Sequence, residues 1–432
     1  MSNTKKLFDR NFSLLWSGQF VSLMGSEIYS IALILFLKQE TGSGTIMGMV
    51  QMARMLPLIA LMPFAGALAD RWNRKRIIVF SDLICGISMI VLSLFGLKYM
   101  LHTDVLSIGS ITIDLSSLEI EVWLIVLVTI IMGAASAMFQ PAIDSFIPDI
   151  VPKDRLKKAN SARESSIWTS MLFGQAIGGY LFQVLGAPLL FLANGASYIL
   201  SSIEESFMKI PKMEKRNEKG LSDFLKKIRE GLSFVGRRRG IRNLYMISAI
   251  LQFLNGPIFI ALPFYVEDVM HLQPAFFGYL MASMGLGAVI GSLCLGALKT
   301  TKKGEYALFS LSFLWFGIAM FFLVLKPDPI ILLVICFVNG VANGVDNVIT
   351  ISRIQSTVES RIRGRVISVL RMFQLGLAPV GFGLGGIIID LLNKDVLKLI
   401  AIIAVFYLMT SIAVILNRAI RNYIVNEDLG LK

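Results

Sequence analysis

The stretch "GALADRWNRKR", Gly66 to Arg76, follows a long apolar run and places four cations within six residues. One carboxylate, Asp70, stands between the apolar run and the cations. A change from apolar to cationic sequence is typical of the cytoplasmic end of a membrane helix, because Lys and Arg accumulate on that side. This rule explains the cations but leaves Asp70 unexplained.

The composition of the whole chain indicates a membrane protein. Hydrophobic residues make up 55% of the 432 residues and charged residues 16%, and the mean hydropathy is +0.70. Soluble domains of this length do not have such a composition. The three cysteines all lie in apolar stretches, where they are expected to act as small packing residues rather than as disulfides.

Apolar segments of suitable length recur along the chain. A bilayer core about 30 Å thick requires roughly 20 apolar residues per crossing helix. We expect the first segment to be retained, since no small-residue cleavage site follows it. Twelve spans are predicted, at residues 12–37, 45–69, 76–99, 122–143, 164–186, 188–208, 243–266, 275–298, 305–325, 328–350, 366–390 and 396–417.

The distribution of Lys and Arg predicts the orientation of these spans. With twelve crossings and a cytoplasmic N-terminus, the cation-rich segments all fall on the cytoplasmic side, and the intervening loops contain few cations. Both termini are therefore expected in the cytoplasm, and a bacterial cytoplasmic membrane is the expected location.

A basic connection, residues 209–242, lies between the sixth and seventh spans. It carries twelve basic and four acidic residues and so supplies +8 of the net charge of +12. Anionic lipid at the membrane surface explains this charge, so no nucleic-acid partner is expected. Its "SDFLKKIREGLSFV" segment has helical spacing and predicts an amphipathic helix. The expected organisation is an N-terminal six-helix half (1–208), this linker (209–242), and a C-terminal half with a short tail (243–432).

The two halves show local sequence echoes. Asn11 at the start of the first span is matched by Asn243 at the start of the seventh, and Gly-Gly pairs recur within 151–179 and 358–386. Two related six-helix halves are typical of a duplicated transporter whose substrate site lies between the repeats.

These residues resemble the major facilitator superfamily over nearly the whole chain. The loop signature between its second and third helices matches Gly66, Asp70, Arg71, Arg74 and Lys75. The segments "FQPAIDSFIPDIVPKDRLKKANS" (139–161) and "RIRGRVISVLR" (361–371) resemble its macrolide-efflux and enterobactin-export branch. The resemblance implies an all-α fold of twelve helices in two pseudo-symmetric halves. It also implies secondary active transport by alternating access, without a cofactor.

The fifth span departs from the family's antiporter signature. It reads "GQAIGG", with Gly174, Gln175, Gly178 and Gly179, and Gln175 stands where the signature has proline. The small residues still permit close helix contact. In the fourth span, Thr129 stands where many drug antiporters have arginine. Both departures weaken the sequence argument for proton antiport.

Glu27, near the middle of the first span, is the first candidate for a coupling residue. A charge at the bilayer centre costs about 2.5–3.5 kcal/mol or more, so it persists when it has a task or a partner. Glu27 is predicted either to bind a proton or a cationic substrate, or to form a permanent ion pair with Arg54 in the second span.

Asp346, in "NGVANGVDNVIT" of the tenth span, is the second candidate. Its Asn and Gly neighbours, including Asn343, are typical of a stretch that lines a cavity. The alternative is an ion pair with Arg353 or Arg371 near the cytoplasmic end.

Further polar and aromatic residues are candidates for the cavity or the gate. Asp144, Glu204 and Glu205 lie near the cytoplasmic ends of their spans, where a gate or interfacial pairing is favoured over substrate contact. Each cavity candidate serves equally well as a helix–helix contact. The cavity candidates are Gln19, Tyr29, Arg54, Asn255, Phe259, Asn343 and Gln374.

The sequence contains few of the residue patterns that an enzyme active site requires. Both histidines, His102 and His271, lie in outward loops, so neither a His-based triad nor a metal cluster is expected. No Gly-x-x-x-x-Gly-Lys-Ser/Thr segment occurs, which disfavours ATP-driven pumping. The chain is not expected to be an enzyme.

Two classes of function therefore stand. The first is a monomeric secondary exporter of amphipathic, drug-like molecules coupled to protons, with siderophores, lysophospholipids or sugars as alternative substrates. The second is a membrane scaffold that transports nothing. For Asp70 we expect a latch at the N-terminus of the eleventh span near Arg365, on the cytoplasmic side.

Overall fold

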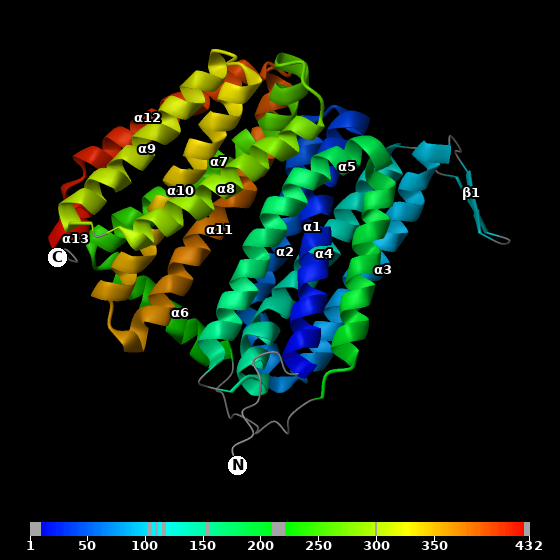
Figure 1. Cartoon of the computed structure of the whole chain (residues 1–432), viewed down its shortest axis with the longest axis horizontal. Helices are drawn as coiled ribbons and strands as arrows, with labels where there is room; N and C mark the ends of the chain where they lie inside the picture. The colour runs from blue at the N-terminus through cyan, green and yellow to red at the C-terminus, as the bar shows by residue number, and fades with distance from the viewer. Residues whose placement is uncertain are drawn as a thin grey trace. The chain divides into compact units, whose positions relative to one another are not determined.

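The computed structural model describes residues 10–101, 105–108, 111–114, 118–152, 155–209, 221–298 and 300–426 (Figure 1). Long helices account for most of these residues, as the apolar segments predict. In chain order the elements are α1 (Arg10–Thr41), α2 (Gly44–Arg71), α3 (Arg74–Leu101), β1 (Val105–Ile108), β2 (Ile111–Asp114), α4 (Leu118–Ile150), α5 (Leu156–Ser206), α6 (Leu221–Gly236), α7 (Arg239–Phe264), the π-helix η2 (Tyr265–Val269), α8 (Ala275–Ala297), α9 (Lys302–Val324), α10 (Pro329–Thr357), α11 (Ser360–Leu391), α12 (Val396–Leu416) and α13 (Arg418–Asn426).

The membrane spans agree with the predicted twelve once α5 is divided. Within the described residues, 11 helices are long and apolar enough to cross a membrane, and one of them, Lys158–Ser206, has 49 residues. That length suffices for two crossings of roughly 20 residues each. Gly186 interrupts the helix with a φ of 74°, a conformation that glycine adopts without strain. The predicted spans 164–186 and 188–208 are thus the two parts of α5.

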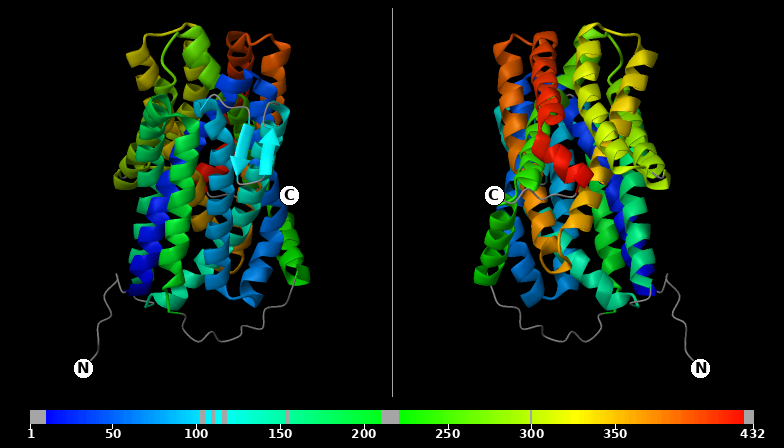
Figure 2. Two further views of the ribbon diagram at one scale, coloured as in Figure 1. Left: turned by 90° about the vertical axis from the view of Figure 1, so that its right-hand side faces the viewer. Right: turned by 90° about the vertical axis from the view of Figure 1, so that its left-hand side faces the viewer.

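A two-stranded β-hairpin departs from the predicted all-α fold. β1 and β2 pair antiparallel, with Val105 opposite Asp114 and Ile108 opposite Ile111 (Figure 2). The hairpin lies between the third and fourth spans, where the sequence predicts an outward loop.

The chain divides into two compact units. The first contains residues 1–40 and 53–221, and the second contains residues 41–52 and 222–432. The start of α2 therefore belongs to the second unit, and the rest of α2 belongs to the first.

The amphipathic helix predicted in the linker is α6, which packs on α11 within the second unit. Glu230 pairs with Arg365, and a side chain at Gly231 would meet Val369 and the backbone of Arg365. The close approach at Gly231 explains why this face of α6 contacts protein rather than lipid.

Corresponding asparagines make corresponding contacts in the two units. The Asn11 side chain donates to the Lys209 carbonyl and accepts from the Lys209 N–H, both at 2.9 Å, just after α5 ends. Asn243 donates to the side chain of Asn417, just after α12 ends, at 3.3 Å. In each unit the first helix thus contacts the chain that follows the last span, which supports the predicted repeat.

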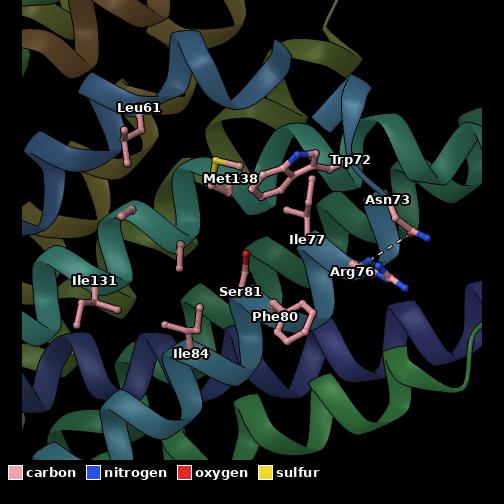
Figure 3. A pocket seen from close by; sticks show the side chains of 12 residues that line it. Leu61, Trp72, Asn73, Arg76, Ile77, Phe80, Ser81, Ile84, Ile131 and Met138 are labelled. Carbon is pink, nitrogen blue, oxygen red and sulfur yellow. Dashed lines mark hydrogen bonds between the residues drawn. The ribbon is translucent and has the colours of Figure 1, made fainter. Parts of the chain in front are cut away.

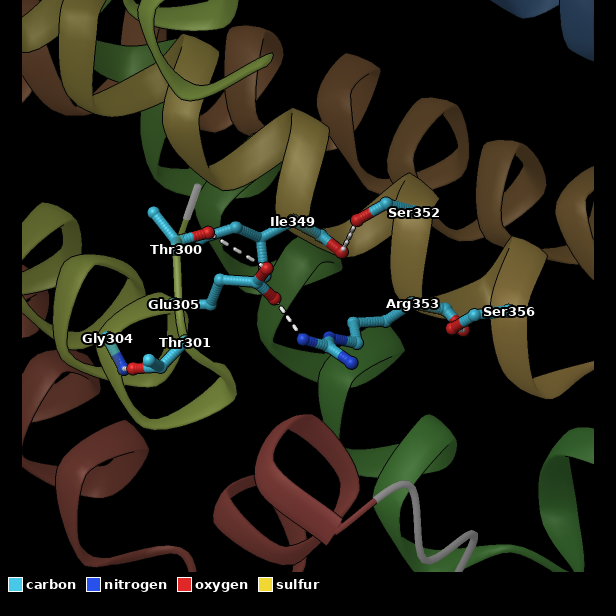
Figure 4. A network of polar contacts seen from close by, with 8 residues as sticks. All are labelled: Thr300, Thr301, Gly304, Glu305, Ile349, Ser352, Arg353 and Ser356. Atoms are coloured by element: carbon cyan, nitrogen blue, oxygen red, sulfur yellow. Dashed lines mark hydrogen bonds and ion pairs between the residues drawn. The ribbon is translucent and has the colours of Figure 1, made fainter. Parts of the chain in front are cut away.

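An ion pair connects the third and fourth helices of each unit. In the first unit Arg74 at the start of α3 pairs with Asp149 near the end of α4 at 2.6 Å. In the second unit Glu305 at the start of α9 pairs with Arg353 of α10 (Figure 4). The two pairs join corresponding helices. The cation lies on the third helix in the first unit but on the fourth helix in the second.

The residue after each of these charges contacts the end of the last span. Lys75 donates to the carbonyl oxygens of Ser206 and Met208 at 2.5 and 2.7 Å. Tyr306 donates to the carbonyl oxygen of Ile415 at 3.0 Å. Cations near a helix C-terminus satisfy carbonyls that have no partner within the helix.

Glycines allow neighbouring helices to approach closely. A methyl group at Gly287 of α8 would overlap the Phe337 carbonyl oxygen of α10, and one at Gly340 of α10 would overlap the Met284 carbonyl oxygen of α8. Small residues at helix interfaces are typical of membrane proteins, because van der Waals packing rather than the hydrophobic effect drives helix association in lipid.

This contact predicts opposite effects for two nearby substitutions in α8. Gly287→Ala inserts a methyl group against Phe337 and should destabilise the protein by about 1–3 kcal/mol, the usual range for overpacking. Gly285→Ala is the matched control, because open space surrounds the position. Thermal unfolding in detergent should show a lower midpoint for Gly287→Ala only. Equal midpoints would contradict the proposed close contact.

Candidate functional site

A polar segment interrupts the apolar sequence of α1 between Gly25 and Ser30. At Gly25 a side chain would meet Ser197 Oγ at 2.5 Å and Asn194 Oδ1 at 2.8 Å, both in the second span of α5. One residue later, Ser26 donates a hydrogen bond to Tyr198 at 2.9 Å. The absence of a side chain at Gly25 allows α5 to place these polar groups against α1.

Glu27 contacts the first span of α5. The Gln175 amide donates a hydrogen bond of 2.8 Å to Glu27 Oε2. A methyl group at Gly174 would lie 2.6 Å from Glu27 Cβ, and one at Gly178 would lie 3.1 Å from Ile28 Cα. The two glycines thus bring the helices together, and Gln175, which replaces the expected proline, supplies the donor to the carboxylate.

Arg54, in α2, contacts α1 one turn after Glu27. Its guanidinium donates to Ser30 Oγ at 3.4 Å, whereas the hydrogen-bond partner of Glu27 is Gln175. The structure therefore shows the cation and the carboxylate near the same face of α1 with separate partners. Glu27 is half-buried, and its hydrogen-bond partner is a neutral amide.

Asp346 has a weak partner in the second unit. Thr350, one turn further along α10, donates to Asp346 Oδ1 at 3.4 Å. Arg353, one of the two cations considered as its partner, pairs with Glu305, which also accepts from Thr300 at 3.1 Å (Figure 4). Asn343 is exposed on the same helix.

The remaining cavity candidates occupy different environments. Tyr29 is fully buried and meets Phe191 edge-on with ring centroids 5.4 Å apart. Gln19 is buried, and its amide nitrogen has no hydrogen-bond partner among the described residues. Asn255 accepts from Tyr407 of α12 at 2.7 Å. Gln374 of α11 is half-buried.

Phe259 belongs to an aromatic group at the contact of three helices. Its ring meets Phe277 of α8 and Phe382 of α11 edge-on, with centroids 5.9 and 5.7 Å away. Gly381 and Gly385 on α11 approach α7 closely beside it. The arrangement places an apolar aromatic surface within the second unit.

The residues predicted near the cytoplasmic ends of their spans contact neighbouring helices of the first unit. Asp144 pairs with Arg163 of α5 at 3.1 Å. Glu204 accepts from Ser17 of α1 at 2.7 Å. Glu205 is fully buried, and Gly179 is buried beside Gly178. The side chains of Gly66, Asp70 and Arg71 lie outside those that the structure describes.

The carboxylate that the structure assigns to Arg365 is Glu230 of the linker helix α6. Asp70 is predicted to lie near Arg365, but the partner of Arg365 among the described residues is Glu230. The spacing of the linker offered no signal for this pair, because 135 residues separate the two charges.

An apolar pocket of about 690 Å³ lies in the first unit between α2, α3 and α4 (Figure 3). Leu61, Ile84, Ile131 and Met138 contribute to its lining, and Arg76 lies at one edge. None of the residues predicted for a substrate cavity lines it. We therefore do not assign it to the candidate site.

Two carboxylates with notable surroundings are not among the residues predicted from the sequence. Asp390 of α11 accepts hydrogen bonds from Ser43 Oγ at 2.7 Å and from the N–H groups of Gly44 and Thr45 at 2.9 Å. It thereby caps the start of α2 within the second unit. Asp82 of α3 is 2% exposed. An acidic residue inside an apolar span was the available signal for both.

Comparison with known proteins identifies the family. The model of the Major Facilitator Superfamily matches residues 15–304 and 270–421. The chain belongs to the major facilitator superfamily. It is 25% identical over 381 residues to macrolide efflux protein A of Streptococcus pyogenes, covering 88% of this chain and 89% of that protein. It is 24% identical over 400 residues to the multidrug efflux pump Tap of Mycolicibacterium fortuitum, covering 90% and 91%.

A solved structure agrees with this assignment at the level of the fold. A bacterial homologue of the iron transporter ferroportin aligns with a TM-score of 0.70 and 15% identity, covering 94% of this chain and 99% of that one. The chain is thus a multi-pass membrane transporter for small molecules and not an enzyme.

The cap at the start of α2 yields a stability prediction for this transporter. Asp390→Ala removes the acceptor for three donors and should destabilise the protein by about 0.5–2 kcal/mol, the range for a lost helix cap. Asp328→Ala is the matched control, because Asp328 precedes α10 but its side chain makes no capping hydrogen bond. Thermal unfolding should separate the two variants, and the same midpoint for both would count against the cap.

Proposed function

We propose that this transporter exports amphipathic, drug-like small molecules across the bacterial cytoplasmic membrane in exchange for protons. Glu27 is the proton-binding residue in this proposal. The observation that carries it is the hydrogen bond between Glu27 and Gln175 at the close contact of α1 with α5. An acidic side chain within a membrane span is retained when it has a function.

The neighbours of Glu27 support reversible proton binding. Gln175 is neutral, and its amide can donate to a carboxylate or accept from a protonated carboxyl group after rotation. The guanidinium of Arg54 donates to Ser30, one turn of α1 away from Glu27, and forms no direct hydrogen bond with Glu27 among those that the structure shows. Both protonation states of Glu27 thus have a suitable partner.

The class of substrate rests on two observations. The relatives named above are efflux proteins for macrolides and for several drugs. The aromatic group of Phe259, Phe277 and Phe382 offers an apolar surface that suits an amphipathic molecule. Asp346 is proposed as a second carboxylate of the transport path, with Asn343 beside it on α10.

The membrane setting is proposed from charge. Cytoplasmic termini and anionic lipid at the basic linker 209–242 follow from the distribution of Lys and Arg. A monomeric protein is part of the proposal. Asp70 remains proposed as a cytoplasmic latch.

Substitution of Glu27 tests the coupling. Glu27→Gln cannot bind and release a proton, so pH-gradient-driven transport of a fluorescent drug into inverted vesicles should fall at least tenfold. Glu164→Gln, an exposed carboxylate on α5, is the control and should transport like the unaltered protein. Unchanged gradient dependence in Glu27→Gln would overturn the role of Glu27.

Transport that persists without any pH gradient in the unaltered protein would instead indicate a uniporter. No movement of any compound in a panel of dyes and antibiotics, with the protein present in the membrane, would favour a scaffold.

A further inference from the structure

The contact between α3 and the second span of α5 encloses acidic side chains that the proposed transport path does not use. Ser202 donates to the Val79 carbonyl oxygen at 3.0 Å. A methyl group at Gly86 would lie 2.7 Å from Ile199 Cδ1. Asp82 stands between Val79 and Gly86 on α3, so it lies within this tightly packed interface.

Asp82, Ser201 and Glu205 form a buried group in this interface, which we call the acidic triplet. Asp82 is 2% exposed, and Ser201 and Glu205 are 0% exposed. Ser201 and Glu205 are one turn apart on α5, the carboxylates lie close enough for their charges to interact, and both carboxyl groups lie near the Ser201 hydroxyl.

Four of the five side-chain oxygens of the acidic triplet have no hydrogen bond of ordinary geometry among the described residues. Asp82 Oδ2, both carboxylate oxygens of Glu205 and Ser201 Oγ are all buried and unpartnered. Helix α1 covers the group, since a methyl group at Gly18 would lie 3.0 Å from Ser201 Oγ. Burying a polar group without a hydrogen-bond partner costs free energy. These buried oxygens therefore indicate a proton or an ion bound between them.

Among the described residues, the surroundings of the acidic triplet supply no counter-charge. The titratable groups next to it are Glu204 of α5, which accepts from Ser17 of α1, and Cys85 and Tyr198, which interact with Asp82. Two nearby cations have other partners. Lys75 donates to carbonyl oxygens at the end of α5, and Arg54 donates to Ser30.

We propose that Asp82, Ser201 and Glu205 form a proton-binding site in which the two carboxyl groups share one exchangeable proton. Ionising both carboxyl groups of such a buried site is unfavourable, because no cation among its described neighbours offsets their repulsion. The protonated carboxyl group donates to the Ser201 hydroxyl, and the hydroxyl donates its own hydrogen to the other carboxylate.

A proton fits the site better than a metal ion does. Within the described residues no three His, Cys, Asp or Glu side chains gather as a metal would need, and the small, tightly packed interface leaves little room for the several waters that Mg²⁺ keeps in proteins. The site is separate from Glu27, whose partner is Gln175. The proposal concerns proton binding in the resting protein and does not depend on the direction or substrate of transport.

Infrared spectroscopy of the full-length protein in liposomes tests the shared proton. A background with both Glu27→Gln and Asp346→Asn removes the carboxyl groups proposed for the transport path, so failure of the proposed function leaves this test intact. The carbonyl band of a protonated carboxylic acid should be present at neutral pH. It should shift in Asp82→Asn and in Glu205→Gln, and it should disappear in the double variant.

Glu164→Gln is the matched control and should leave the band unchanged, because Glu164 is exposed on the same helix. An unchanged band in the double variant would overturn the proposal. Loss of the band on addition of Na⁺ at constant pH would also overturn it, because the site would then bind a metal ion.

Thermal unfolding against pH gives a second measurement that remains valid if the double variant does not fold. At alkaline pH the shared proton is lost and two negative charges stay buried, so the unaltered protein should lose stability as pH rises. Asp82→Asn leaves at most one charge there and should lose less. Parallel pH profiles for the two proteins would contradict the shared proton.

Discussion

Helices in lipid are not driven together by the hydrophobic effect, so this fold depends on backbones that approach closely enough for van der Waals contact. Glycines provide that approach at the contact of α8 with α10 and of α1 with α5. The same contacts fix where polar side chains lie. Gly174 and Gly178 set the distance at which Gln175 reaches Glu27, so the candidate site follows directly from the packing.

Acidic side chains in this transporter occupy three kinds of environment. Asp390 receives three hydrogen bonds at the start of α2 and is suited to remain charged. Glu27 has one amide donor and a cation one turn away. The acidic triplet has neither donors nor a cation among its described neighbours. The surroundings, rather than the residue type, therefore distinguish these carboxyl groups.

The sequence predicted the spans well, because bilayer thickness fixes their length and the lipid fixes their composition. It also selected Glu27, since a charge within an apolar span is conspicuous. It did not reveal the partner of Glu27, because 148 residues separate it from Gln175. Asp82 was missed because it follows the cations Arg74 to Arg76 closely, and only the packing of α3 on α5 shows that it is buried.

The exchanged charges of the two ion pairs bear on how the chain assembles. Arg74 pairs with Asp149 in one unit, and Glu305 pairs with Arg353 in the other. If the third helix of one repeat met the fourth helix of the other during insertion, Arg74 would face Arg353 and Glu305 would face Asp149. Like charges repel, so the wrong partner is rejected. Two repeats with similar apolar helices thereby keep their own neighbours during biogenesis.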